Sequence, residues 1–422
     1  MEELKPALSV VTLDHVSCGK STAVGHMLFQ SGYYPQRMMD KLEEEARGRG
    51  KASSKYAWLT DQTANDASVL LTQKYALTII NAGGHRDSFR LAVSAAAQAD
   101  CVILTVAAID REFECGMVGG TGLTKEHALV AFTLGMKQVI VLVTKMDATS
   151  TPYSQARFES IKAEVGEFLM KVGFREENVQ FVPVSGCEGE NLVTKSTPLL
   201  DAINALKVPK RATNKPLRIP VQKVYKTAGV GTVITGRVET GVLRVGRPLL
   251  IGPTIRRGSV FSIESHNRQL TEAPAGTCVS ITAKNISKID IEQGFVLSDA
   301  RHDATRSAME FTAQIVILKH PGCIRPGYTP TIYCHAIRTT CRVTRLVSKL
   351  NRSRGEEVEK APDFVREGDA CIVEITPTTY DVFEAFHEYP SLSRIILRDS
   401  GELVAVGVTQ SVNKTDIPVE YW

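Results

Sequence analysis

The first half of the chain alternates short apolar runs with segments of helical periodicity. The runs typical of buried strands are residues 8–13, 75–80, 101–108, 138–145 and 179–186. The helical segments begin at Ser21 and then cover residues 87–98, 125–135 and 153–173. Because parallel strands need crossover connections, this alternation predicts a mostly parallel, doubly wound sheet with helices on both faces.

The pattern changes at residues 208–216, a polar stretch flanked by prolines that indicates a linker. After the linker, short β-type runs separated by glycine, proline and charged residues continue, and no long helical period returns. This half predicts two β-barrels, with the break between them in the polar segment 298–307. We therefore expect an α/β domain over residues 1–208 and β-barrel domains over residues 216–305 and 308–422.

The 422 residues are 43% hydrophobic and 23% charged, so each of these domains has enough apolar residues to bury a core. The first residues lack the pattern of a secretion signal, and no apolar run reaches membrane-spanning length. Nine cysteines without regular spacing are typical of free thiols in a reducing compartment. We expect a cytoplasmic protein with no membrane segment. The net charge of +4 alone says little about partners.

A phosphate-binding loop is the first candidate for chemistry. Between the first predicted strand and the first helix, the sequence is Asp14-His15-Val16-Ser17-Cys18-Gly19-Lys20-Ser21-Thr22. It matches GxxxxGK[ST] at every defining position except the first. In that pattern the loop amides and the lysine hold phosphates, and the serine hydroxyl binds Mg²⁺. The strand before the loop and the helix after it favour this interpretation over an ordinary turn.

Asp14 replaces the first glycine of the pattern. An aspartate tolerates a positive φ there at a cost of ~1 kcal/mol. If its carboxylate faced a phosphate at about 5 Å, the repulsion would be roughly 3 kcal/mol at an effective dielectric near 20. The direction of the Asp14 side chain therefore decides how well the loop holds a nucleotide.

The other strand ends carry matching candidates. Asn81 stands where GTPases have the Asp of an Asp-x-x-Gly sequence, which holds Mg²⁺ through water, and its neutral amide predicts weaker metal binding. Gly84 keeps its place against the γ-phosphate. His85 is the candidate catalytic residue that orients the attacking water, the alternative being a solvated loop histidine.

The guanine-reading candidates follow the fourth and fifth strands. Thr144, Lys145 and Asp147 resemble the Asn-Lys-x-Asp sequence, in which the carboxylate accepts from the N1–H and the exocyclic amine of guanine. Ser185-Gly186-Cys187 supplies backbone donors for the guanine oxygen. Each of these short motifs alone is weak evidence for nucleotide binding. Their order at successive strand ends, however, predicts a GTP/GDP and Mg²⁺ site with Ser21 and Asn81 facing the metal.

These residues resemble elongation factor one-alpha, the aminoacyl-tRNA carrier of eukaryotic and archaeal ribosomes. The resemblance covers nearly the whole chain. Further segments that carry it are residues 54–58, 123–147, 152–159, 181–186, 213–225, 236–246, 311–322 and 400–408. It implies a P-loop GTPase domain, two β-barrels, and delivery of aminoacyl-tRNA to the ribosome by a monomer that a nucleotide-exchange factor serves. It also implies a pocket for the tRNA end, for which Glu239 and His266 are candidates beside the alternative of ordinary surface residues.

The chain also departs from this family. Asp14, Ser17, Asn81, Gly83 and Thr144 replace family residues, and the stretch after Trp58 lacks the threonine that closes on Mg²⁺. Thr60 and Thr63 are possible substitutes, and spacing favours neither. Two functions thus stay open beside each other: an active, slow GTPase that carries tRNA, and a non-catalytic adaptor that keeps the ribosome or tRNA contacts. A termination or ribosome-rescue relative is the third alternative.

A basic run in the last domain is relevant to all of these alternatives. Its members are Arg338, Arg342, Arg345, Lys349, Arg352 and Arg354. Such a run is typical either of a solvated hairpin or of a surface that binds nucleic acid phosphates.

Overall fold

The computed structural model divides the chain into two compact units, Met1–Pro209 and Lys210–Trp422. It describes residues 5–15, 17–48, 55–61, 68–82, 89–118, 122–193, 198–227, 229, 231–266, 268–352 and 354–415. In this part of the chain, none of the helices combines the length and apolarity that crossing a bilayer requires.

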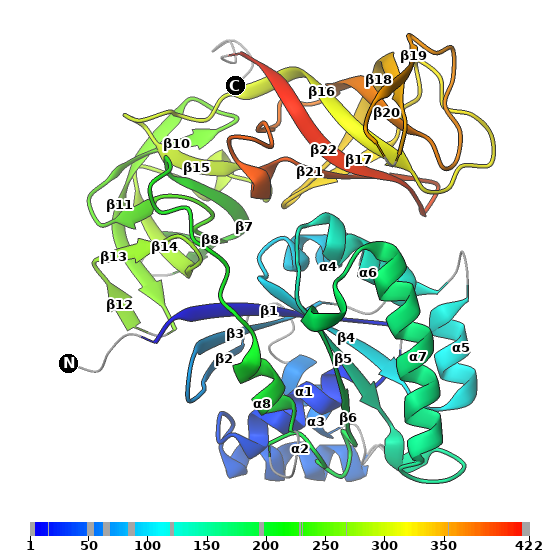
Figure 1. The fold of residues 1–422 in the computed structure, drawn as a ribbon. Helices are drawn as coiled ribbons and strands as arrows, with labels where there is room; N and C mark the ends of the chain where they lie inside the picture. Colours follow the sequence, from blue (N-terminus) through cyan, green and yellow to red (C-terminus); the bar gives the residue numbers. More distant parts are fainter. Residues whose placement is uncertain are drawn as a thin grey trace. The chain divides into compact units, whose positions relative to one another are not determined.

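The first unit is built on a six-stranded sheet in the order β2-β3-β1-β4-β5-β6 (Figure 1). The strands are β1 (Ala7–Asp14), β2 (Ser68–Leu71), β3 (Ala76–Asn81), β4 (Cys101–Ala107), β5 (Val139–Thr144) and β6 (Val179–Pro183). Only β2 is antiparallel to its neighbour. Every residue of β4 and β5 is buried, which is why these two strands are continuous apolar runs rather than alternating ones.

Helices cover both faces of this sheet, as the sequence predicted (Figure 1). One face carries α1 (Lys20–Gln30), α2 (Gln36–Gly48), α3 (Lys55–Asp61) and α8 (Leu199–Ala205), which share one hydrophobic core with the strands. The other side carries α4 (Phe89–Ala96), α5 (Asp110–Met117), α6 (Leu123–Thr133) and α7 (Gln155–Val172). Short 3-10 turns lie at Met146–Ala148, Glu176–Asn178, Lys288–Asp290 and Pro390–Leu392.

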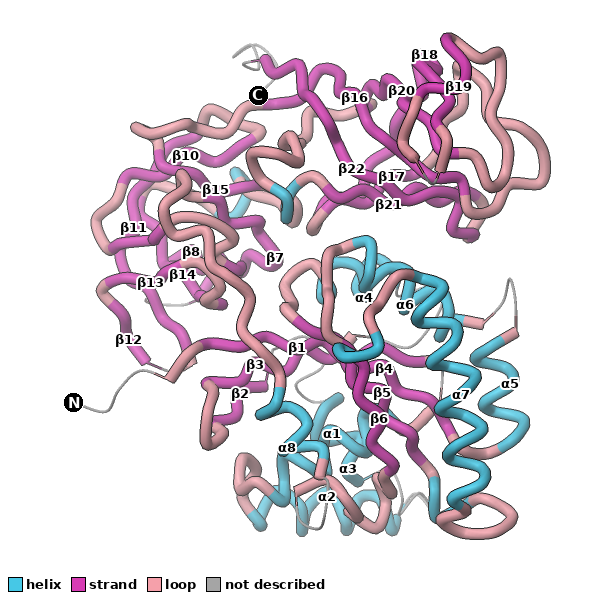
Figure 2. The backbone as a smooth tube through the Cα atoms, in the orientation of Figure 1, coloured by secondary structure: helices cyan, strands magenta, loops and turns pink. Residues whose placement is uncertain are grey.

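The second unit contains two antiparallel β-domains and no α-helix among its described residues (Figure 2). The first domain has β7 (Arg218–Thr227), β8 (Gly231–Arg237), β10 (Pro248–Gly252), β11 (Arg256–Ser265), β12 (Arg268–Leu270), β14 (Cys278–Lys284) and β15 (Val296–Asp299). Its sheet closes on itself because β10 pairs with both β15 and β11. A separate small pair joins β9 (Val242–Arg244) to β13 (Glu272–Pro274).

The second β-domain closes in the same way, through pairing of β17 with both β21 and β18. Its strands are β16 (Ser307–Ile317), β17 (Thr331–Cys334), β18 (Ile337–Leu350), β19 (Glu357–Lys360), β20 (Ala370–Pro377), β21 (Arg394–Asp399) and β22 (Glu402–Thr415). Each domain has its own hydrophobic core. The α/β domain followed by two β-barrels is therefore the architecture that the sequence predicted.

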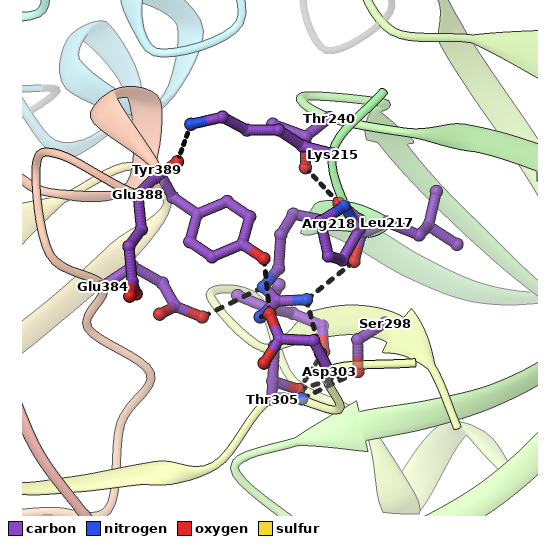
Figure 3. A network of polar contacts seen from close by, with 12 residues as sticks. Lys215, Leu217, Arg218, Thr240, Ser298, Asp303, Thr305, Glu384, Glu388 and Tyr389 are labelled. Carbon is purple, nitrogen blue, oxygen red and sulfur yellow. Dashed lines mark hydrogen bonds and ion pairs between the residues drawn. The ribbon is translucent and has the colours of Figure 1, made fainter. Parts of the chain in front are cut away.

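A buried ion-pair network joins the two β-domains (Figure 3). Arg218, at the start of β7, is fully buried and donates to Glu384 at 3.0 Å and to Asp303 at 2.7 Å. Glu384 is also fully buried, and it belongs to the second β-domain, where it meets Lys414 as well. The Tyr389 ring stacks on the Arg218 guanidinium, 4.2 Å away, and its hydroxyl donates to Asp303. Burial by itself raises the pKa of Asp303, but the bonds from Tyr389 and Arg218 outweigh it and hold that pKa below its usual range.

We expect Arg218→Met to destabilise the second unit by ~3–5 kcal/mol, because it leaves the Glu384 carboxylate buried with one of its two cationic partners removed. Urea unfolding of the full chain measures the loss. Lys319→Met is the matched control, since it removes a surface ion pair with Glu402 that is about half exposed on both sides; a loss below ~1 kcal/mol is expected there. Equal small losses for both variants would contradict the prediction.

Candidate nucleotide-binding site

Those predicted site residues of the first unit that the structure describes lie on one edge of the sheet. Thr12 pairs with Asn81, Asp14 with Thr105, and Ala107 with Thr144, so the carboxyl ends of β1, β3, β4 and β5 come to a common edge. Ligands of such sheets bind at this edge. The structure therefore brings together Asp14, Lys20, Asn81 and Thr144, which the sequence separates widely.

The loop after β1 has two residues in the left-handed region, Ser17 with φ 66° and Gly19 with φ 84°. Asp14 is not one of them; it ends β1 as an ordinary strand residue, so the backbone strain anticipated for it is absent. Gly19 precedes the first turn of α1, which holds Lys20, Ser21 and Thr22. Val16 lies outside the described residues. Burial and the neighbouring Asp14 raise the pKa of the Cys18 thiol to about 12, which keeps it neutral in the loop.

Asp14 and Lys20 form a buried ion pair. Their side chains are 6% and 4% exposed, and Lys20 Nζ lies 3.2 Å from Asp14 Oδ1. The same ammonium donates to the carbonyl of Ala82, the residue after β3. The lysine that a phosphate would need is thus occupied by a carboxylate of its own loop. A nucleotide has to replace or share this partner, and the Asp14 charge then stays close to the phosphates.

The second cation of the predicted site is paired as well. Lys145, which has φ 57°, places its ammonium 2.6 Å from Glu112 in α5. Asp147 follows in the 3-10 turn at Met146–Ala148 and is half-buried. The Thr144 hydroxyl ties the loop locally, as the sequence predicted. It lies within hydrogen-bond distance of the carbonyl oxygen of Cys18 and, at 3.2 Å, of that of Val106. The phosphate loop and the base-reading loop are therefore connected through Thr144.

The third guanine-reading element is a tight loop after β6. Ser185 and Glu190 form an isolated antiparallel β-bridge, and the Ser185 hydroxyl accepts from the Glu188 backbone N–H at 3.1 Å. Within the described part of the chain, the backbone N–H groups of Gly186 and Cys187 meet no acceptor. Two adjacent free donors at this edge suit a carbonyl acceptor such as the guanine oxygen.

The metal-facing residues are less well suited to their predicted role. Asn81 Oδ1 accepts from the Thr12 hydroxyl at 3.0 Å, so the oxygen that the sequence predicts to face the metal already has a neutral partner. Ser21 is half-buried at the start of α1. Thr60 is buried, and its hydroxyl is directed to the carbonyl oxygens of Ala57 at 2.7 Å and Ser21 at 3.4 Å. Thr63, Gly84 and the candidate catalytic His85 lie outside the described residues.

The candidates for the tRNA end lie in the second unit. Glu239 follows β8, is 9% exposed and lies 3.5 Å from Arg237. His266 follows β11 with φ 54°, and burial together with Arg268 lowers its pKa. Both belong to one end of the barrel, since Arg237 pairs with Cys278 and the Ser265 hydroxyl donates to the Cys278 carbonyl at 2.7 Å.

The basic run lies on β18 and the turn that follows it. Arg345 forms two bonds with Glu374, and Lys349 lies 2.8 Å from Asp369, so both are locally neutralised. Arg338 and Arg342 are exposed and have no acidic partner in the described part of the chain. The cations free for phosphate are therefore fewer than the sequence suggests.

Comparison with known proteins decides the family. The model of the elongation factor Tu GTP binding domain matches residues 5–209, that of elongation factor Tu domain 2 matches 231–298, and a GTP-eEF1A C-terminal domain-like model matches 310–410. Elongation factor 1-alpha of Sordaria macrospora is 41% identical across 98% of this chain and 96% of its own length. That of Absidia glauca is also 41% identical, across 99% and 97%. The chain belongs to the elongation factor 1-alpha family.

Members of the elongation factor 1-alpha family are translational GTPases, which hydrolyse GTP, and this chain is one of them. Solved structures with the same fold include SelB from Methanococcus maripaludis, with a TM-score of 0.71, 17% identity, and coverage of 99% of this chain and 81% of that one. The Ski7 GTPase-like domain of S. cerevisiae, bound to GTP, has a TM-score of 0.75 and 15% identity, with coverage of 96% and 97%.

Sequence motifs do not reveal every residue of the site. Glu112, which holds Lys145, lies in none of the segments that the sequence analysis singled out. Tyr153 has φ 57°, and burial, a bond to Glu190 and the charge of Asp147 raise its pKa to about 12. A bulky residue with positive φ is an uncommon feature, but only coordinates show it.

We expect Asp14→Asn and Asp14→Gly to strengthen GDP binding by one to two decades, because a carboxylate near the phosphates costs roughly 3 kcal/mol at most. The gain should appear with and without Mg²⁺, since it concerns Lys20 and the phosphates. Isothermal titration measures it. Glu177→Gln changes the net charge equally at an exposed position and should leave the affinity unchanged. Weaker GDP binding by both Asp14 variants would contradict the prediction.

Asn81→Asp should act through the metal instead. Restoring the carboxylate is expected to increase the ratio of GTP affinity in Mg²⁺ to that in EDTA by about 10-fold, the usual weight of a residue that holds a metal through water. Asn178→Asp, in the turn that precedes β6 at the opposite edge, is the control for added charge. An unchanged Mg²⁺ dependence in Asn81→Asp would refute the metal argument.

Proposed function

We propose that this chain binds GTP and delivers aminoacyl-tRNA to the ribosome. The supporting observation is the 41% identity to elongation factor 1-alpha along 98% of the chain, which includes all three domains. The nucleotide would contact the carboxyl edge of the first unit, with the base at Asp147 and the Gly186–Cys187 amides. The tRNA end would contact Glu239 and His266, on the barrel that follows.

Ser21 and Asn81 are the residues that would hold Mg²⁺, and the bound ion would supply charge neutralisation between phosphates during hydrolysis. The chain's own residues would hold and orient the nucleotide. Thr144 connects the phosphate loop to the base-reading loop. Lys20 would contact the phosphates once its ion pair with Asp14 opens. Hydrolysis should be slow, because Asn81 lacks the metal-facing charge. His85 remains the proposed catalytic residue.

A second function is favoured by one specific observation, the buried Asp14–Lys20 pair. A phosphate loop whose lysine is neutralised internally is stable without nucleotide, which suits an adaptor that keeps the shape and contacts of its relatives. Under this alternative, tRNA or ribosome binding would not depend on GTP. In either case we propose action in the cytoplasm as a monomer, and in the first case a nucleotide-exchange factor as a further partner.

Protection of the aminoacyl ester separates the two functions. The full chain is mixed with aminoacyl-tRNA and with GTP, GDP or no nucleotide, and the rate of spontaneous ester hydrolysis is measured. Slower hydrolysis with GTP than with GDP supports tRNA delivery. Equal protection in all three mixtures supports the adaptor, and no protection in any of them rules out a role in binding the tRNA end.

The exposed arginines of β18 give a prediction about tRNA affinity. Arg338 and Arg342 have no acidic partner in the described chain, so each should displace counterions from tRNA. The double variant Arg338→Ala/Arg342→Ala should therefore lower the magnitude of the slope of log K against log salt by about 1–2. Arg345→Ala is the matched control, because Glu374 already neutralises that side chain. Filter binding between low and physiological salt measures the slopes. An unchanged slope in the double variant would contradict the assignment of this surface.

A further inference from the structure

The loop that supplies the guanine donors is held from behind by α1. Gly186 approaches α1 so closely that an added Cβ would lie 3.1 Å from Ala23 N. One turn further along the helix, His26 is buried, and its Nδ1 lies 2.8 Å from the Gly186 carbonyl oxygen. Since a carbonyl can only accept, Nδ1 carries the proton.

The remaining contacts fix the same tautomer of His26. Its Nε2 lies 3.4 Å from the Gln30 amide nitrogen, which donates, so Nε2 is the unprotonated nitrogen of a neutral ring. The other hydrogen of that amide serves the Gly189 carbonyl at 3.0 Å. Burial lowers the pKa of His26, which agrees with a neutral ring. His26 and Gln30 thus hold two carbonyls of the loop, at its beginning and at its end.

Pinning the Gly186 carbonyl also sets the direction of the next amide. The Gly186 carbonyl and the Cys187 N–H belong to one planar peptide unit, and in a trans unit they point in opposite directions. The single cis bond in the described chain is elsewhere, at Gly252–Pro253. The Cys187 N–H therefore points away from α1, out of the loop, and it is one of the two donors without an acceptor in the described chain.

The ring of His26 is itself fixed by a second element. Tyr56 of α3 stacks on it with centroids 3.7 Å apart and planes 8° from parallel. α3 can approach α1 this closely because Gly25 has no side chain; a Cβ there would lie 2.1 Å from the Tyr56 carbonyl. The stack holds the plane of the imidazole, and the hydrogen bonds to Gly186 and Gln30 oppose a flip of the ring within that plane.

We propose that His26 is a positioning residue for guanine recognition: its Nδ1–H holds the Gly186 carbonyl so that the Cys187 N–H is aimed at the guanine O6. The inference rests on the nucleotide site of the proposed function. It predicts a coupling between the side chain at position 26 and the atom at position 6 of the base, although the two do not touch.

Two substitutions separate the two contacts of the ring. His26→Phe keeps the stack on Tyr56 and removes the donor. His26→Asn keeps a donor at the position of Nδ1 and removes the stack. GDP and 6-thio-GDP, whose sulfur is a poor acceptor, are titrated against the wild type and both variants, and melting temperatures report on folding.

The wild type should bind GDP more tightly than 6-thio-GDP, and His26→Phe should reduce GDP affinity about tenfold with little change for 6-thio-GDP. His26→Asn should retain most of the wild-type preference. Equal losses for both nucleotides in His26→Phe would mean that His26 only supports packing, and would overturn the inference while GDP binding by the wild type stands. A wild type that binds neither nucleotide would refute the nucleotide site and this inference together.

Discussion

Two strands buried on both faces are the constraint on which the nucleotide site depends. β4 and β5 have no exposed position, so residues that contact a ligand can lie only at or beyond the ends of these strands, and parallel pairing brings those ends to one edge. Asp14, Asn81, Thr144 and the loop at Ser185 meet there because the hydrophobic core leaves no other place for them. The rest of the first unit holds these ends in register.

Charge at this edge is balanced within the chain. Lys20 is paired with Asp14 and Lys145 with Glu112, so both cations of the site have an internal anion. The first pair is buried, and breaking such a pair by removing one partner is costly, because a charge stays behind without water. A phosphate that enters is itself an anion and can take the place of Asp14. In the proposed nucleotide site, we expect the competition between these two anions to set the affinity for nucleotide.

Sequence reasoning recovered the elements whose pattern is strong and missed those whose evidence is spatial. The apolar runs, the linker and the order of motifs predicted the architecture, an α/β domain followed by two β-barrels, and the carboxyl edge of the first sheet. Helix α2 was not predicted, although Met39, Leu42 and Ala46 have the spacing of a buried helix face; its highly charged remainder hides them. The direction of the Asp14 side chain, the partner Glu112 and the role of His26 depend on atoms that approach from distant segments. No spacing rule contains that information.

The Arg218 network has a consequence for how this chain can change over evolution. One arginine from the first β-domain neutralises a glutamate buried in the second, and the segment between them supplies Asp303. Neither barrel can be exchanged for the barrel of a relative unless its partner's half of the network comes with it, since a mismatched pair would bury an uncompensated charge. We therefore expect the two barrels to be inherited together, with recombination tolerated more readily on the N-terminal side of Arg218 than between the barrels.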